Sequence, residues 1–86
     1  NLIPMGLGST GRAVAANLNE QIALNSILSD PRKGTVIVES IGDTRWLNWS
    51  KMSITKTLSN GESITIHYVA KFKDGIMIAV DDFKFK

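Results

Sequence analysis

The chain has 86 residues, of which 43% are hydrophobic and 21% charged, with a formal net charge of +2 and no cysteine. This length provides one hydrophobic core and excludes a second domain, and the apolar content excludes a disordered chain. The absence of cysteine excludes disulfides, thiolate zinc sites and cysteine nucleophiles, and no apolar run reaches the roughly 20 residues that a membrane-spanning helix needs.

The first residues predict a lead segment. Residues 1–11 contain three glycines and the pair Ser9-Thr10, so we expect a flexible lead or linker with little fixed structure. We expect residues 12–86 to form a single domain.

A helix is expected next, because the composition of residues 13–29 favours one. Asn17 and Glu20 have the spacing of a capping box, and Asp30-Pro31 stops the helix. The apolar residues give it a broad side, which we expect to be mostly buried against a sheet: Leu18, Ile22, Leu24, Ile27 and Leu28.

The rest of the chain predicts strands. The β-branched run 35–39 is typical of a first strand, and residues 41–49 indicate an irregular connection anchored by two tryptophans. Beyond it, apolar residues alternate with polar ones, as in strands with one buried face: Met52, Ile54, Leu58, Ile64, Ile66, Tyr68, Ala70, Phe72, Ile76, Ile78 and Val80. We therefore predict an α+β fold, with an N-terminal helix (or two) packed on a four- to five-stranded antiparallel β-sheet.

The alternation also predicts the strand register. Directly opposed residues share a face, so each hairpin needs a three-residue loop that ends in a left-handed glycine, Gly61 in the first and Gly75 in the second. This register places Ser53 opposite His67, and His67 opposite Asp81.

The end of the chain breaks the alternation, since Phe83 and Phe85 have the wrong parity to follow Val80. A β-bulge near Asp81-Asp82 would turn both phenylalanines toward the core. The same bulge would move two lysines, Lys84 and Lys86, to the polar face that holds His67.

The polar face predicted by this register gathers groups suited to RNA chemistry. Its members are Lys51, Ser53, Thr55, Thr65, His67, Lys71, Asp81 or Asp82, Lys84 and Lys86. Metal-independent RNA cleavage needs a base for the 2′-hydroxyl proton, an acid for the leaving oxygen and cations for the phosphate charge. His67 suits the role of acid or base, and Asp81 or Asp82 would orient its ring and favour its charged form.

Further residues are candidates for binding the phosphate and a base, and each also has a non-functional interpretation. The lysines and Arg45 would hold the phosphate, and Trp46 or Trp49 would stack on a base. A lone histidine on the solvated face of a strand can also lack any catalytic role. Both tryptophans can equally be buried in a core. Asp81-Asp82 lack further acidic or histidine ligands for magnesium, so we predict neither a metal nor a cofactor.

The chain resembles a toxin module at the C-terminus of large secreted bacterial proteins, the CdiA proteins of contact-dependent growth inhibition and related polymorphic toxins. The likeness spans nearly the whole chain. It rests on these segments: Gly8-Ser9-Thr10-Gly11-Arg12, Asn17-Leu18-Asn19-Glu20-Gln21, Asp43-Thr44-Arg45-Trp46, Trp49-Ser50-Lys51-Met52, His67-Tyr68 and Asp81-Asp82-Phe83-Lys84-Phe85-Lys86. Thr44 stands where the family has proline in its tryptophan loop.

The resemblance implies a ribonuclease of the barnase/EndoU/colicin/RelE (BECR) type. Such modules often cleave transfer RNA in the cytoplasm of a neighbouring bacterium, are delivered as part of a secreted or cell-surface protein, and are neutralised by a cognate immunity protein. The sequence does not indicate whether a host factor activates this one.

Combined with the polar face, the resemblance gives two sets of site residues. The catalytic set is His67, Arg45, Lys51, Asp82 and Lys84. The substrate-binding set is Tyr68, Lys71, Lys86, Trp46 and Thr65. The alternatives are a metal-dependent deoxyribonuclease toxin and a non-enzymatic protein-binding module.

Overall fold

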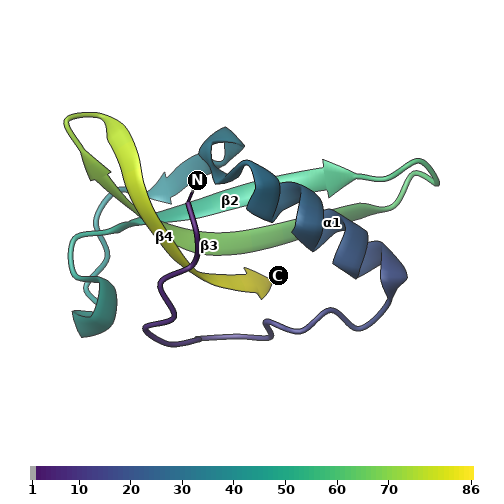
Figure 1. Ribbon diagram of the computed structural model, residues 1–86, viewed down its shortest axis with the longest axis horizontal. Helices are drawn as coiled ribbons and strands as arrows, with labels where there is room; N and C mark the ends of the chain where they lie inside the picture. The colour runs from purple at the N-terminus through teal and green to yellow at the C-terminus, as the bar shows by residue number, and fades with distance from the viewer. Residues whose placement is uncertain (1) are drawn as a thin grey trace.

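The computed structural model describes residues 2–86, which form one α-helix packed on one face of a four-stranded antiparallel sheet (Figure 1). The elements are α1 (Leu18–Ser29), β1 (Thr35–Val38), β2 (Ser50–Thr57), β3 (Ser63–Lys73) and β4 (Ile76–Phe85), with two short 3₁₀ turns, η1 (Pro31–Lys33) and η2 (Thr44–Trp46). The strands lie side by side in the order β1-β2-β3-β4. The predicted α+β fold is confirmed.

The predicted capping box starts α1. The side chain of Asn17 accepts a hydrogen bond from the Glu20 amide at 2.9 Å, and the Glu20 carboxylate accepts one from the Ala16 amide at 2.7 Å. Arg12 also donates two hydrogen bonds of 2.7 Å to this carboxylate. The bonds from Arg12, followed by the one from Ala16, lower the pKa of Glu20 to about 2. The helix ends where Asp30-Pro31 predicts.

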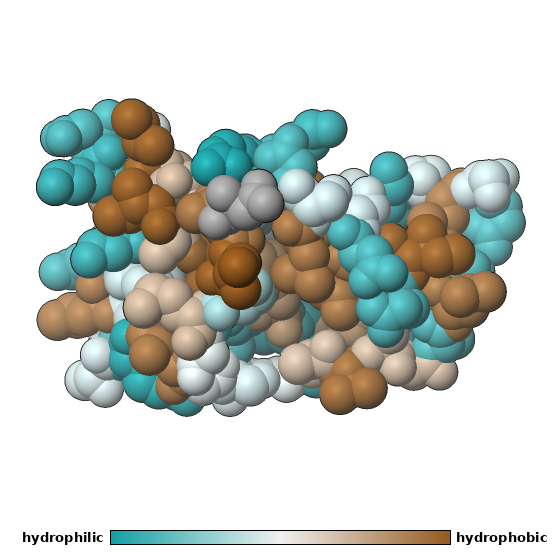
Figure 2. Space-filling model, in the orientation of Figure 1, coloured by the Kyte–Doolittle hydropathy of each residue, from teal (hydrophilic) through white to brown (hydrophobic). Residues whose placement is uncertain are grey.

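The apolar side of α1 is narrower than expected. Ala23 and Ile27 are buried in the core, whereas Leu18 and Ile22 are 74% and 46% exposed. Helical periodicity places these last two on the side away from Ala23 and Ile27, so the sheet cannot cover all of them. Apolar side chains accordingly remain at the surface on the helix side of the molecule (Figure 2).

The main core lies between α1 and the sheet. It consists of Ala23, Ile27, Met52, Ile64, Ile66, Tyr68, Ala70, Met77, Val80, Phe83 and Phe85. A smaller cluster on the other face of the sheet combines Trp46, Trp49 and Val69. Residues 41–49 are therefore an irregular connection anchored by two tryptophans, as predicted.

The two hairpins differ. In the β2–β3 hairpin the Leu58 amide donates to the Glu62 carbonyl at 2.8 Å, and Gly61 has a φ of 89°, so the three-residue loop is confirmed. The β3–β4 prediction is wrong: Lys73 pairs directly with Ile76, and Asp74-Gly75 form a two-residue turn in which both φ angles are positive. This turn is the hairpin type that matches the strand twist.

The shorter turn changes which residues of β4 face the core. Met77 is buried, and Ile76 and Ile78 are 63% and 44% exposed, contrary to prediction. The β3–β4 register then shifts, because Lys71 pairs with Ala79 and leaves Ile78 as an extra residue.

A second irregularity in β4 confirms the bulge predicted near Asp81-Asp82. His67 pairs with Lys84 and Val69 with Asp81, so β4 has one more residue than β3 in this interval, and Asp82 has a φ of 55°. Phe83 and Phe85 turn to the core as predicted. The predicted pairing of His67 with Asp81 is wrong, because the two-residue turn and the extra residue at Ile78 place Asp81 opposite Val69. Ser53 does pair with His67.

The N-terminal segment lies along the outer side of β4. Pro4 forms a parallel bridge with Val80, and the Met5 amide donates to the Val80 carbonyl at 3.1 Å. Farther along, the Phe85 amide donates to the Arg12 carbonyl at 2.9 Å. The expectation of little fixed structure is therefore wrong for residues 4–11, since backbone and carboxylate groups of β4 accept hydrogen bonds from their amides.

Candidate functional site

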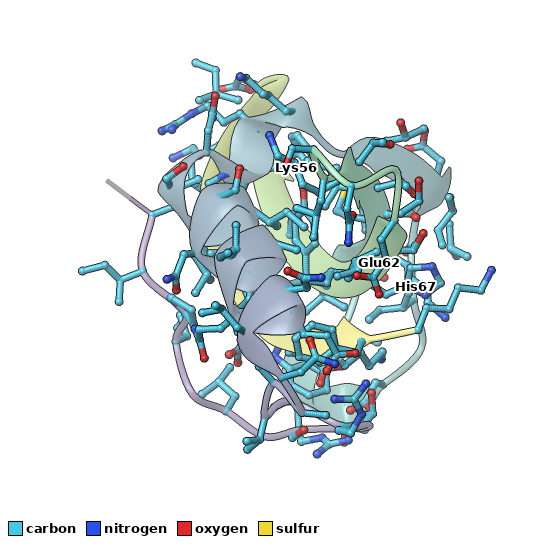
Figure 3. The ribbon with its side chains drawn as sticks, turned by 90° about the vertical axis from the view of Figure 1, so that its right-hand side faces the viewer. Lys56, Glu62 and His67 are labelled. Atoms are coloured by element: carbon cyan, nitrogen blue, oxygen red, sulfur yellow. The ribbon has the colours of Figure 1, made fainter. Side chains whose placement is uncertain are left out.

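An open basic face surrounds His67, on the side of the sheet away from α1 (Figure 3). His67 lies in β3 between Ser53 of β2 and Lys84 of β4, and its side chain is partly buried. Because paired residues share a face, the register defines what we call the His67 face. Its members are Lys51, Ser53, Thr55, Thr65, His67, Lys84 and Lys86.

The surroundings of His67 favour its neutral form. Its pKa is lowered below 6.5, chiefly by partial burial and then by the positive charges of Lys51, Lys86 and Lys84. This contradicts the expectation that a carboxylate next to the ring would favour the charged form. A neutral imidazole can accept a proton at neutral pH.

The lysines of the His67 face are held differently. The Lys84 ammonium donates to the Asp82 carboxylate at 3.0 Å and to the Thr10 hydroxyl. Within residues 2–86, Lys51 and Lys86 form no ion pair. The face therefore combines one fixed ammonium group with two that remain available to an anionic ligand.

Hydroxyl groups extend the face away from His67 along β2 and β3. Thr55 and Thr65 lie opposite each other, and their hydroxyl oxygens are 2.7 Å apart. Beyond them, the hydroxyls of Thr57 and Ser63 are 3.1 Å apart. The structure thus places Thr65 and Ser53 on the same face of the sheet as His67, as the register predicted.

Asp81 is a buried anchor and lies outside the open part of the face. Its carboxylate accepts hydrogen bonds from the amides of Gly6 and Leu7, both at 2.8 Å, and from the Trp46 indole at 2.9 Å. Burial opposes ionisation, but these bonds and one from the Asp82 amide keep the pKa of Asp81 below its usual value. The predicted role of Asp81 as orienter of the His67 ring is therefore wrong.

Asp82 holds the N-terminal segment and one lysine. It is 5% exposed and accepts from the Thr10 amide at 2.8 Å and the Thr10 hydroxyl at 2.7 Å, besides the bond from Lys84. Its contact with the candidate site is through Lys84. Asp82 therefore positions this cation and does not face a substrate itself.

The tryptophan loop contributes one charged group at the border of the site. Trp46 is 1% exposed and cannot stack on a base, contrary to prediction. The Arg45 guanidinium lies 4.4 Å from the centre of the Trp46 ring and 2.9 Å from Asp43. Lys84 also lowers the pKa of Asp43, after the stronger effect of Arg45, so this pair lies near Lys84.

Two other predicted site residues lie elsewhere. Tyr68 belongs to the opposite face, where it is fully buried, stacks on Phe83 at 4.6 Å and donates to the Pro31 carbonyl. Burial raises the pKa of Tyr68 to about 12. Lys71 lies on the same side of the sheet as His67, where it is exposed opposite Ala79, but Val69 separates it from His67 along β3. Tyr68 is therefore outside the candidate site, whereas Lys71 lies on the predicted side of the sheet but beyond the tryptophan cluster residue Val69.

Sequence reasoning missed Thr10 and Asp43. Thr10 and Asp82 are 72 positions apart in the sequence, so no local pattern signals their contact. Asp43 accepts a hydrogen bond from the Arg45 amide at 2.9 Å at the start of η2, and this local turn motif is a signal that spacing alone could have revealed.

Two further observations concern metal-ligand groups and membrane-length helices among the described residues. Within residues 2–86 no three histidine or acidic side chains gather into a ligand set. All four carboxylate oxygens of Asp81 and Asp82 accept hydrogen bonds from protein donors. No helix in this part of the chain is long and apolar enough to span a bilayer.

Comparison of the chain with protein-family models, curated proteins and solved structures found no match. The likeness to CdiA-type toxin modules therefore stays a prediction from sequence.

Proposed function

We propose that the chain is a metal-independent endoribonuclease whose active site is the His67 face. One observation carries this proposal: an imidazole kept in its neutral form shares an open sheet face with three ammonium groups, those of Lys51, Lys84 and Lys86. A phosphodiester brings negative charge to the cations and a 2′-hydroxyl proton to the imidazole.

The proposed reaction is an internal transesterification of RNA. His67 takes the proton from the 2′-hydroxyl, the 2′-oxygen forms a bond to phosphorus, and the bond from phosphorus to the 5′-oxygen breaks. The imidazolium then returns the proton to the departing 5′-oxygen. The products are a 2′,3′-cyclic phosphate and a free 5′-hydroxyl, and no metal or other co-reactant is needed.

The lysines stabilise the charge that builds up on the phosphate oxygens. Lys84 is fixed beside His67 by Asp82 and Thr10, so little reorganisation is needed when that charge develops. Lys51 and Lys86 are free to contact the phosphate directly. They also keep His67 neutral until substrate arrives, since a bound phosphate offsets their charge and favours the imidazolium.

The biological part of the proposal rests on the resemblance to CdiA-type modules. In this role the chain is an antibacterial toxin that cleaves RNA, with transfer RNA the preferred substrate, in the cytoplasm of a competing bacterium. The partner that neutralises it is an immunity protein with an acidic surface, because such a surface complements the cations of the His67 face.

The test is cleavage of total bacterial RNA by the purified chain in excess EDTA. We expect cleavage with cyclic phosphate ends, and loss of cleavage in His67→Gln. The matched control is Lys56→Met, because Lys56 is an exposed lysine that pairs with Ile64 and lies apart from His67 (Figure 3). This control should cleave like the wild type.

Other outcomes would support the alternatives. Cleavage of DNA that stops in EDTA would overturn the proposal in favour of a metal-dependent deoxyribonuclease. RNA binding without cleavage, equally strong in His67→Gln, would indicate a non-enzymatic binding module.

A further inference from the structure

The two edges of the sheet differ in whether another segment of the chain covers them. The N-terminal segment lies along the outer side of β4, where Pro4 and Met5 pair with Val80. Within residues 2–86, the backbone of β1 forms strand pairs with β2 alone. The outer side of β1 therefore presents unpaired amide and carbonyl groups, which are a template for another strand.

The side chains of β1 do not discourage such pairing. Its sequence is Thr-Val-Ile-Val, all four residues are exposed, and it has no charged residue and no proline. Natural proteins commonly protect an edge strand with lysine or proline. Its one irregularity is a register shift between Val36 and Val38, which limits the length of regular pairing.

The two ends of β1 carry opposite charges, so two antiparallel copies of the strand would bring a positive end next to a negative end. Arg32 and Lys33 precede the strand and Glu39 follows it. The Lys33 side chain is 76% exposed, and its nearest carboxylate, that of Asp30, is 4.0 Å away. Glu39 is exposed and forms no ion pair within residues 2–86.

We propose that two copies of this chain associate by antiparallel pairing of their β1 strands. When the pairing is centred on Val36, Lys33 of one copy lies at the same end of the strand pair as Glu39 of the other, and two-fold symmetry repeats this proximity of opposite charges. Parallel pairing would instead bring Lys33 close to Lys33. The apolar middle of the strand brings no like charges together.

The dimer would join two sheets into one. A two-fold axis through an antiparallel strand pair is perpendicular to the sheet, so both His67 faces lie on the same side. The two basic faces would then form one extended surface. The pairing is short, and we expect a dimer that dissociates on dilution. Its existence does not depend on the proposed ribonuclease activity.

The test is sedimentation equilibrium of the purified chain over a wide concentration range. We expect a monomer–dimer equilibrium that is weakened severalfold by Lys33→Glu and by Glu39→Lys. The double variant Lys33→Glu/Glu39→Lys reverses both charges and should restore the wild-type dissociation constant. Lys73→Glu is the control, because it changes an exposed lysine at the end of β3 and should leave association unchanged.

Two results would overturn the proposal. The first is a chain that stays monomeric at every concentration, which would leave β1 for a different partner. The second is a dimer that none of the charge reversals affects, since it would use another surface. Hydrogen exchange gives an independent reading: β1 amides should exchange more slowly at high protein concentration.

Discussion

Two polar sites lie only a few residues apart on the same face of the sheet, and they are built in opposite ways. Around Asp81, both carboxylate oxygens accept hydrogen bonds from distant parts of the chain, and the Asp81 side chain itself is buried. Around His67, three ammonium groups share an open surface, and only Lys84 is paired with a carboxylate. The first arrangement stabilises the fold, and the second leaves unused binding capacity.

The largest effect should come from breaking the closed site. Asp81→Ala leaves the amides of Gly6 and Leu7 and the Trp46 indole without their acceptor. We expect the free energy of unfolding to fall by about 4 kcal/mol, because one buried and two partly buried donors lose a charged partner. Urea unfolding measures this. A loss below about 1 kcal/mol would show that water replaces the carboxylate and that the site is not closed.

The next effect separates function from stability. His67→Ala should reduce RNA cleavage about a hundredfold or more, because a general base is lost, and it should leave the free energy of unfolding within about 0.5 kcal/mol of the wild type. Single-turnover cleavage and urea unfolding of the same preparation give both values. Parallel losses of stability and cleavage would contradict the division between the two sites.

A smaller change tests one contact of the closed site. Trp46→Phe removes the indole donor but keeps an aromatic ring below Arg45. We expect a loss of about 1.5 kcal/mol, the size of one hydrogen bond to a charged acceptor. RNA cleavage at a temperature where the variant is folded should be unaffected, because the buried Trp46 ring does not reach substrate.

The smallest effect concerns the charge of His67. Lys51→Met removes one of the positive charges that lower the pKa of His67, so this pKa should rise toward its ordinary value. NMR titration of the imidazole measures the shift. Lys56→Met is again the control, and an equal shift in both variants would show that the effect of Lys51 is not local.

Sequence patterns predicted those parts of the fold that depend on local periodicity. The alternation from Met52 onward gave the strands, and the loop ending in Gly61 placed Ser53 opposite His67 correctly. The parity of Phe83 and Phe85 required a bulge, which the structure contains. These features follow from residues that are near each other in sequence or that must share one buried face.

The remaining features depend on contacts that no local pattern reports. Parity cannot distinguish a three-residue loop from the two-residue Asp74-Gly75 turn followed by an extra residue at Ile78, so Asp81 was placed opposite the wrong partner. The glycine-rich N-terminus resembles a linker, yet its amides bind carboxylates more than 70 positions away. The position of a carboxylate relative to His67 therefore could not be predicted from sequence.

The most direct test of the account compares two titrations of the wild-type chain in EDTA. NMR gives the midpoint of His67 protonation, and single-turnover cleavage gives the pH dependence of the rate. Because the base must be neutral, the rate should fall in acid with the same midpoint as the imidazole, below pH 6.5. A rate that does not change as His67 becomes protonated, or cleavage that persists unchanged in His67→Ala, would contradict the account.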